Sequence, residues 1–330
     1  MEMIKFPQLD YRVLVQCRTY NQAKYIEETL NGFAKQQTTF PFVCLVIDDC
    51  STDGEQQVIK SWMDRECNMN SVQKFEIELS DVVIVPHISN SECTFVFYFL
   101  KENIYRTKKK VPYLVDWLEK SEYTAACEGD DYWTSPEKLQ LSVDFLDSHP
   151  DYSVVCHRFK NYHDEEKKIY DDDKEYLFKN NPEGITFEKG FKHYMTQTLC
   201  TTYRPRDLDE FRMFPGSHSD AVLGHFLLKK GKGYCINKYM GVYRHNGSSV
   251  WSEIGFKEKA MWNYKMYKSL YEYEKDWSSR MAYYSQYVTA LYATKGMILF
   301  KEHFDPLKVL FVPYYILVKI VRFFKRKINK

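Results

Sequence analysis

Phe42-Val-Cys-Leu-Val-Ile47, followed by Asp48-Asp-Cys-Ser-Thr-Asp-Gly54, is the stretch that decides the fold. The apolar run predicts a buried strand, and the polar residues after it predict a turn into a helix over residues 55–66. The preceding part of the chain shows the same order of a strand followed by a helix, with the strand predicted at 11–17 and the helix at 23–36. Strand–helix–strand–helix alternation indicates an α/β protein built on a parallel sheet.

The rest of the chain is less regular. Further strands are predicted at 81–86, 123–127 and 152–156 and near Tyr234 and Met240, and further helices near 111–119, at 136–148 and 219–230, and from about 255 onward. Apart from that helix, residues 87–122 show no clear pattern. The charged residues 160–184 are interpreted as a surface excursion, whose run Asp171-Asp-Asp173 is a solvated loop rather than a metal site.

Composition limits the classes of function. A chain of 330 residues can form one large domain or a domain with an appendage, and a net charge of +1 gives no general case for nucleic-acid binding. Nine cysteines, an odd number without any CxxC pair, indicate free thiols in a reducing cytosol rather than a disulfide or zinc framework. The first ten residues lack the apolar core of a signal peptide.

A second informative stretch is Glu128-Gly-Asp-Asp-Tyr-Trp133, which follows an apolar run and precedes Pro136 at the start of a helix. Adjacent carboxylates at the end of a strand repel each other, and a hard divalent cation with oxygen ligands relieves that cost. The stretch therefore predicts a site for a metal ion and a diphosphate. A turn with an Asp cap before a helix explains it equally well.

Three segments in order resemble the bacterial family 2 glycosyltransferases of GT-A fold. The first segment consists of Val13–Asn21 and Ile47–Gly54, and the second is Glu128–Leu139. The third consists of Ser219-Asp220, Gly231–Tyr234, Met240–Arg244 and Val250–Ser252. The resemblance covers about residues 10–255. It implies a Rossmann-like, mostly parallel mixed sheet flanked by helices over residues 1–255, with residues 256–330 as a helical extension.

The resemblance also implies inverting transfer of a sugar from a nucleotide-diphosphate sugar, with UDP the expected nucleotide, assisted by Mn²⁺ or Mg²⁺. By analogy, the nucleotide is expected to contact Arg18, Thr19, Tyr20, Asp49 (through its base) and Asp130 (near the ribose). Asp131 is expected to bind the metal, and Asp220 to act as general base. Similar sequences often carry a metal-binding His at the position of Asn246, whereas here a His stands one residue earlier, at His245, which becomes the second candidate metal ligand.

Each of these residues also has a structural explanation. Asp48, Ser51 or Asp53 can cap the following helix, and we expect such a cap together with a nucleotide contact by Asp49. Asp220 suits the first turn of a helix, where an acid complements the macrodipole. His245, in an Arg-His-Asn turn, can be an ordinary surface residue.

The C-terminal tail combines apolar and basic residues. Residues 306–324 are rich in Val, Leu, Ile, Phe and Tyr, and on a helix the basic residues form one stripe: Lys308, Lys319, Arg322, Arg326 and Lys330. The uninterrupted apolar run is too short to cross about 30 Å of hydrocarbon, so an in-plane helix on an anionic membrane surface is expected. A helix packed on the catalytic domain is the alternative.

The sequence therefore predicts a glycosyltransferase on the cytoplasmic face of the membrane, acting on a glycan or lipid-linked acceptor of a cell-surface polysaccharide, with no nucleic-acid partner and an unassigned oligomeric state. A nucleotidyltransferase acting on sugar phosphates is a rival. It usually carries a Gly-rich basic loop after its first strand, where this chain has Arg18-Thr-Tyr-Asn21. A non-catalytic module that binds sugar nucleotides is the second rival.

Overall fold

The computed structural model describes residues 6–105, 107, 111–187, 197–216, 218–247 and 254–295. The chain divides into two compact units, which are described separately. The first comprises Met1–Glu210 and Leu223–Asn246, and the second comprises Phe211–Val222 and Gly247–Lys330. The domain boundary at residue 255 stays a prediction.

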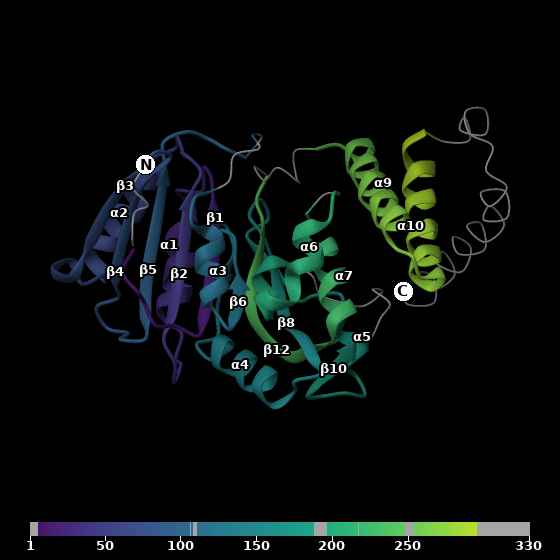
Figure 1. Cartoon of the computed structure of the whole chain (residues 1–330), viewed down its shortest axis with the longest axis horizontal. Helices are drawn as coiled ribbons and strands as arrows, with labels where there is room; N and C mark the ends of the chain where they lie inside the picture. The colour runs from purple at the N-terminus through teal and green to yellow at the C-terminus, as the bar shows by residue number, and fades with distance from the viewer. Residues whose placement is uncertain are drawn as a thin grey trace. The chain divides into compact units, whose positions relative to one another are not determined.

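The first unit is built on one mixed sheet, drawn from purple to green in Figure 1. Its strands are β1 (Val13–Thr19), β2 (Phe42–Asp48), β3 (Gln73–Ile77), β4 (Ser80–Pro86), β5 (Cys93–Leu100), β6 (Tyr123–Ala126), β7 (Tyr132–Trp133), β8 (Tyr152–His163), β9 (Lys168–Tyr170), β10 (Gly184–Phe187), β11 (Thr202–Tyr203) and β12 (Lys232–His245). Their order is β10-β12-β8-β11-β6-β1-β2-β5-β4-β3, with β7 on β12 and β9 on β8. The centre, β6-β1-β2-β5, is parallel, as the strand–helix alternation predicts.

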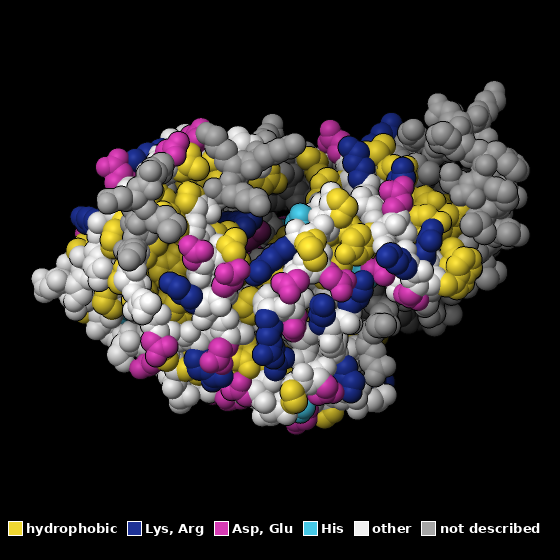
Figure 2. Space-filling model, in the orientation of Figure 1, with side chains coloured by type: hydrophobic (Ala, Val, Ile, Leu, Met, Phe, Trp, Pro, Cys, Tyr) yellow, Lys and Arg dark blue, Asp and Glu magenta, His cyan; other side chains and the backbone are white. Residues whose placement is uncertain are grey.

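The helices follow the alternation of the sequence. They are α1 (Ile26–Ala34), α2 (Glu55–Glu66), α3 (Leu114–Lys120), α4 (Lys138–Ser148), α5 (Glu175–Phe178), α6 (Asp209–Met213), α7 (Asp220–Lys230), α9 (Phe256–Tyr273) and α10 (Trp277–Lys295), with short 3₁₀ turns at Met69–Ser71, Thr198–Cys200 and Pro205–Leu208. Figure 2 shows basic and acidic side chains interspersed over the viewed surface, in keeping with a net charge of +1. All nine cysteines are free thiols.

Strand β5 lies in the segment that shows no strand pattern in the sequence. It pairs with β2 in parallel and with β4 in antiparallel, and so occupies the interior of the sheet. Seven of its eight residues are buried, so its sequence Cys-Thr-Phe-Val-Phe-Tyr-Phe-Leu shows no alternation of apolar and polar residues. Strands covered on both faces read as continuous apolar runs, and periodicity alone does not distinguish them from other buried segments.

Two strands are longer than the sequence pattern predicts. Strand β8 continues to His163 rather than ending near Cys156. Strand β12 replaces the two short strands expected near Tyr234 and Met240, because irregularities after Ile236 and Tyr239 break its alternation without ending it. The acidic run is also not wholly solvated, since Asp172 is buried.

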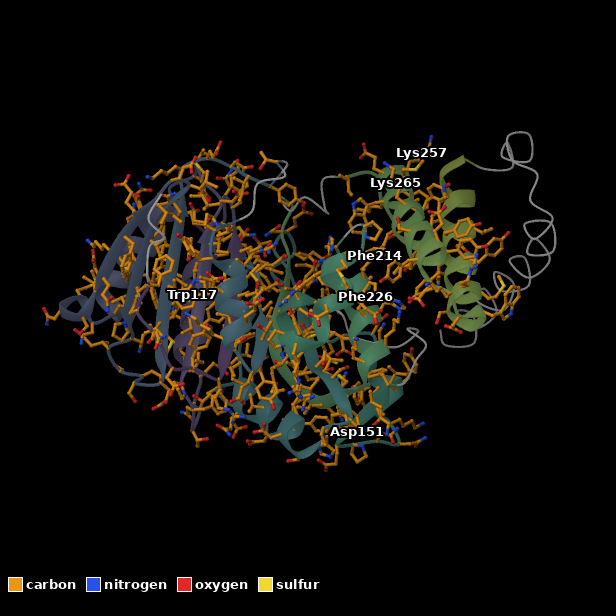
Figure 3. All side chains as sticks on the ribbon, viewed as in Figure 1. Trp117, Asp151, Phe214, Phe226, Lys257 and Lys265 are labelled. Carbon is orange, nitrogen blue, oxygen red and sulfur yellow. The ribbon has the colours of Figure 1, made fainter. Side chains whose placement is uncertain are left out.

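Helix α3 packs on the sheet through Trp117, which is labelled in Figure 3. Its indole Nε1 donates to the hydroxyl of Tyr98 at 3.0 Å, and the hydroxyl of Tyr11 donates to its carbonyl oxygen at 2.7 Å. The helix begins after Tyr113, whose φ of 65° is left-handed, and this explains why it starts later than the pattern near residue 111 suggests.

Lys138, at the start of α4, is fully buried. Its Nζ lies 2.9 Å from Thr202 Oγ1 and 4.1 Å from the centroid of the Trp133 ring, and no ion pair among the described residues includes it. Burial lowers the pKa of Lys138 to about 7. The unfolded chain, with a lysine pKa of about 10.4, therefore binds more protons than the folded protein between the two values.

Stability should accordingly rise with pH in this window. Because the unfolded state holds the extra proton, the Lys138 contribution to the free energy of unfolding should increase by roughly 1.5 kcal/mol between about pH 7 and about pH 8.5. Lys138→Met keeps the stem but removes the amine, so the rise should be absent from this variant. Urea unfolding of both proteins at the two pH values measures it, and a variant-minus-wild-type difference that does not change with pH would contradict it.

The second unit contains the paired helices α9 and α10. Their contact is rich in tyrosine: Tyr284, Tyr287 and Val288 are buried, with Tyr264, Tyr267 and Tyr271 packed against them. This confirms the helical pattern expected after residue 255. Within the described part of the chain, no helix has both the length and the apolar character needed to cross a membrane. The tail from Pro306 lies outside the described residues, as do Val250, Trp251 and Ser252.

Candidate functional site

Three loops meet at the edge of the sheet where β1, β2 and β6 have their carboxyl ends. The Asp49 amide donates to the Thr19 carbonyl oxygen at 3.0 Å, and the Gly129 amide donates to the Arg18 carbonyl oxygen at 3.2 Å. The end of β1 therefore joins the Asp49 loop on one side to the Glu128–Asp131 loop on the other. Ligands of open α/β sheets bind beyond the carboxyl ends of the strands, so this edge is the candidate site.

The loop after β1 is held by hydrogen bonds to Glu55, a residue that the sequence analysis did not select as a candidate. Glu55 is fully buried, and its carboxylate accepts hydrogen bonds from the Thr19 hydroxyl, the Gln22 amide (2.8 Å) and the Ser51 hydroxyl (2.8 Å). Burial raises the pKa of Glu55, while these hydrogen bonds oppose the rise. The Thr19 side chain is thus directed into the protein, whereas Arg18 and Tyr20 are exposed.

Close packing at this loop explains a glycine. A Cβ atom at Gly129 would overlap the side chains of Thr19 and Gln22. The backbone of the Glu128–Asp131 loop can approach β1 only because residue 129 has no side chain. The same loop is held from the other side by Thr29, whose hydroxyl lies 2.9 Å from the Gly129 carbonyl oxygen and 2.6 Å from that of Asp131.

The two aspartates after β2 have different environments. Asp48 is buried, and its Oδ2 accepts from the Ser51 amide at 3.2 Å and from Gln56 Nε2 at 2.6 Å, which connects the strand to helix α2. Asp49 Oδ1 accepts from the Ile104 amide at 2.7 Å and so holds the loop after β5. The N-cap residue of α2 is Gly54, which has no side chain to cap the helix. Asp53 supplies a hydrogen bond at this end instead, since its Oδ1 accepts from the Glu55 amide at 3.1 Å.

Asp130 and Asp131 are both buried but face different partners. Asp131 Oδ1 accepts from the Arg244 amide at 2.7 Å, and Asp130 Oδ2 accepts from Asn246 Nδ2 at 2.8 Å. Burial raises the pKa of Asp130, and burial with the nearby charge of Asp130 raises the pKa of Asp131 well above its ordinary value. The Asn246 Oδ1 atom is buried and has no hydrogen-bond partner among the described residues. The Asp130 carboxylate and the Asn246 amide therefore place oxygen atoms at this edge of the sheet, and the Asn246 Oδ1 atom is available to accept a bond.

Arg244 fixes the end of β12 to this loop. Its Nε donates to the Asp130 carbonyl oxygen at 2.8 Å, and its guanidinium pairs with Glu28 and Asp164. The aromatic rings of Tyr25, Tyr132 and Tyr162 surround it, with centroids 4.6, 5.3 and 5.2 Å from its Cζ. A buried arginine with such partners resists displacement, so it positions both the Asp130–Asp131 loop and Asn246.

His245 belongs to a different set of residues. Its Nε2 lies 2.9 Å from Asn161 Oδ1, and its ring stacks on that of His163 with a centroid distance of 4.3 Å. Successive residues of a strand point to opposite faces, which explains why Arg244 faces the aspartates and His245 does not. Burial, together with His163, lowers the pKa of His245. The metal role given to His245 by the resemblance is not tested by these contacts, but they bring Asn246, rather than His245, to Asp130.

Asp220 is the first residue of α7 and is exposed, and it belongs to the second unit. Its role as general base therefore stays a prediction. Among the residues that the structure describes, no group of three or more His, Cys, Asp or Glu side chains is arranged to hold a metal ion. The sequence pattern pointed to Asp130 and Asp131 but gave no signal for Glu55, because a charged residue in the first turn of a helix is normally exposed.

Known proteins resemble this chain in sequence over limited regions. Residues 18–77 match the family described as glycosyl transferase family 2. The uncharacterized protein Rv1520 of Mycobacterium tuberculosis is 34% identical over 139 residues, which cover 42% of this chain and 32% of that protein. The poly(ribitol-phosphate) beta-N-acetylglucosaminyltransferase TarS of Staphylococcus aureus is 46% identical over 50 residues, 14% of this chain and 8% of TarS. The matches thus span a third or less of these relatives.

Solved structures resemble nearly the whole chain. The S. aureus TarS 1-349 structure in complex with UDP-GlcNAc has a TM-score of 0.55 at 18% identity and covers 88% of this chain and 76% of its own. The mannosyltransferase PcManGT from Pyrobaculum calidifontis, in complex with GDP-Man and Mn²⁺, has a TM-score of 0.52 at 16% identity and covers 94% and 81%. These likenesses confirm the GT-A type of sheet predicted from the sequence. The match over residues 18–77 links this part of the chain to glycosyl transferase family 2, and the solved structures, at 18% and 16% identity, show the fold alone.

Proposed function

We propose that the protein is an inverting, metal-dependent glycosyltransferase that moves a sugar from a UDP-sugar to a glycan or lipid-linked acceptor of a cell-surface polysaccharide. The observation that carries this proposal is the buried pair of Asp130 and Asn246, with its unpartnered Oδ1, at the carboxyl edge of a family 2 fold. An oxygen-lined site at that edge suits a nucleoside diphosphate and its cation.

The nucleotide is assigned to the loops after β1 and β2. Arg18 and Tyr20 are exposed there, and Asp49 stands at the end of a central strand. A carboxylate at this position can accept a ring N–H from uracil, which supports UDP as the nucleotide. The Asp49 Oδ1 bond to the Ile104 amide fixes the orientation of that carboxylate. Thr19, also expected at the nucleotide, is buried and its hydroxyl donates to Glu55, so we assign it to support of the loop after β1.

The metal is assigned to Asp130 together with Asn246. A divalent cation of the Mg²⁺ or Mn²⁺ type prefers oxygen ligands and keeps positions open for substrate phosphates, so two protein oxygens suffice. Once bound, such a cation would neutralise the charge that develops on the departing diphosphate. The resemblance gives Asp131 as the metal ligand, and that assignment stays a prediction. Because its Oδ1 accepts from the Arg244 amide, we propose that Asp131 positions the loop.

The acceptor hydroxyl must lose a proton as it attacks the anomeric carbon. We assign this proton to Asp220, the family's base by resemblance, whose exposed carboxylate stands at the start of α7. One carboxylate on the acceptor side and a leaving diphosphate on the other side give inversion in a single displacement.

A thermal-shift series tests the donor assignment. UDP, GDP, UDP-GlcNAc and GDP-mannose are added with and without Mn²⁺, and UDP compounds with Mn²⁺ are expected to raise the melting temperature most, since ligand at about 100 times its Kd stabilises by about 2.7 kcal/mol. Slow, Mn²⁺-dependent hydrolysis of the stabilising sugar nucleotide should accompany binding. Binding without hydrolysis would favour a non-catalytic module, and a requirement for a nucleoside triphosphate would favour a nucleotidyltransferase.

We further propose that the tail from Pro306 attaches the protein to the cytoplasmic face of the membrane. Attraction to an anionic leaflet is worth about 1 kcal/mol per basic residue near the surface, and apolar burial adds to it. Replacing Lys308, Lys319, Arg322, Arg326 and Lys330 with Gln should therefore release the protein from anionic vesicles in a co-sedimentation assay at moderate salt. Equal sedimentation of the variant and the wild type, or none of either, would refute this attachment.

A further inference from the structure

The first unit contains a cavity on the face of β8 and β12 that carries His245. The cavity has a volume of about 370 Å³ and is lined by residues of β8 and β12, by residues 170–174 and by Gln197. This volume falls within the range of about 300–1,000 Å³ that is typical of small-ligand pockets. The proposed donor site does not use it.

Aromatic and imidazole rings form one wall of this cavity. The rings of His163 and His245 stack with a centroid distance of 4.3 Å and an interplanar angle of 17°. Tyr170 stands edge-on to His163, with centroids 5.3 Å apart, and is 43% exposed. Flat, partly exposed ring faces of this kind bind apolar C–H surfaces, such as one face of a sugar or polyol chain.

Other lining residues of the cavity carry hydrogen-bonding groups. Asp172 is buried, and its carboxylate accepts from Arg158 Nε at 2.9 Å and from the Lys174 amide at 2.8 Å, which fixes the turn. Asp171 and Asp173 are exposed, with side-chain exposures of 64% and 86%, and pair with Lys160 and Lys174. Exposed carboxylates accept hydrogen bonds from hydroxyl groups.

The charges of the lining residues disfavour an anion. The charged groups of the lining are three aspartates and one lysine, Lys174. Two cations outside the lining, Arg158 and Lys160, pair with Asp172 and Asp171. A phosphate or carboxylate in the cavity would meet three carboxylates whose cationic partners are already engaged, whereas an uncharged group rich in hydroxyls could donate hydrogen bonds to them.

The position of the cavity links it to the proposed transfer reaction. His245 forms part of the wall, and the next residue along the chain, Asn246, contacts Asp130. The cavity and the proposed metal site thus lie on either side of the end of β12. A transferase must bring its acceptor next to the donor, and the wall residue His245 is one position along the chain from the proposed donor site.

We infer that this cavity binds an uncharged, hydroxyl-rich unit of the acceptor, either a sugar or a polyol, through the His163–His245 wall, Tyr170 and the exposed carboxylates. This inference rests on the proposed function, since it calls the ligand an acceptor. It adds the chemical class of the acceptor and a role for two features, His245 and the acidic run, that the donor site leaves unused.

The test uses the full chain with ring-labelled histidine. Methyl β-D-glucopyranoside and ribitol are the uncharged probes, and glucose 6-phosphate and ribitol 5-phosphate are their anionic counterparts. NMR signals of His163 and His245, assigned with His163→Gln and His245→Gln, should move on titration with at least one uncharged probe. The matching phosphate should bind about tenfold more weakly, the equivalent of about 1.4 kcal/mol.

Two variants of Tyr170 make the test specific. Tyr170→Ala removes an exposed ring and should weaken binding of the uncharged probe about tenfold, whereas Tyr170→Phe keeps the ring and should bind like the wild type. Asp151→Asn, at the exposed residue labelled in Figure 3, is the surface control. No shift with either uncharged probe, or equal or tighter binding of the phosphates, would overturn the inference.

The same samples separate this inference from the proposed function. UDP binding in Mn²⁺ is measured on each protein by calorimetry. Polyol binding in a protein that does not bind UDP would confirm the ligand class of the cavity and contradict the glycosyltransferase proposal. UDP binding without any polyol response would contradict the cavity and leave the donor site standing.

Discussion

Asp130→Asn should lower the affinity for UDP in Mn²⁺ by about 30-fold or more, a loss of about 2 kcal/mol. The amide keeps the shape of the side chain and still accepts from Asn246, so the loop should stay in place. It lacks the negative charge that a hard cation requires, so the part of the affinity that depends on the metal should disappear. Calorimetry with Mn²⁺ and with a chelator measures that part as the difference between the two titrations.

Asp131→Asn is the matched control for this result. Its Oδ1 can still accept from the Arg244 amide, so the variant should fold and should retain most of the Mn²⁺-dependent affinity. Asn246→Ala should weaken metal-dependent binding more than Asp131→Asn, because it removes the unpartnered oxygen beside Asp130. If Asp131→Asn abolishes the metal dependence while Asp130→Asn retains it, the assignment drawn from the family resemblance is right and the one drawn from the contacts is wrong.

The parallel centre of the sheet was predictable because its strands and turns carry local signals. The run Phe42–Ile47 is apolar throughout, since β2 is buried on both faces, and Gly54 marks the turn with a left-handed φ of 93°. Such signals need only neighbouring residues. Strand β5 is equally apolar and follows Pro86 and Ser89-Asn-Ser91, but periodicity alone does not separate a fully buried strand from other buried segments.

The candidate site was predictable as a set of residues but not as a set of contacts. Asp130 and Asn246 are 116 positions apart, and their hydrogen bond depends on the register of β12 against β7 and β8. A shift of one residue would turn His245 toward the aspartates in place of Arg244. The sequence spacing therefore could not decide between His245 and Asn246, because irregularities within β12 set which residue faces the site.

The same reasoning explains the residues that were missed. Arg244 stands in a charged, aromatic context that suits a surface turn, yet it is buried among three tyrosines and two carboxylates. Glu55 looks like an acid in the first turn of a helix, yet it supports Thr19 from inside the protein. Burial of a charged side chain depends on partners distant in sequence, and one chain read alone does not reveal them.

Asp220→Asn should lower kcat for transfer by about 10²–10⁴-fold while leaving the affinity for the donor nearly unchanged. The amide keeps the size and polarity of the side chain but cannot take the proton of the acceptor hydroxyl. Loss of a group that acts only as the acceptor is deprotonated should appear in turnover rather than in donor binding. Steady-state kinetics with the acceptor, together with calorimetry of the donor, separates the two quantities.

Asp209→Asn is the matched control, because Asp209 is also an exposed acid in the first turn of a helix. Replacing either acid weakens the favourable interaction with its helix dipole by about 0.3–1 kcal/mol, so both variants should lose similar stability. Only Asp220→Asn should lose turnover, and Asp220→Glu, which restores a carboxylate at a longer reach, should recover part of it. Near-wild-type kcat in Asp220→Asn would leave Asp220 as an acid at a helix end and would require a base elsewhere in the chain.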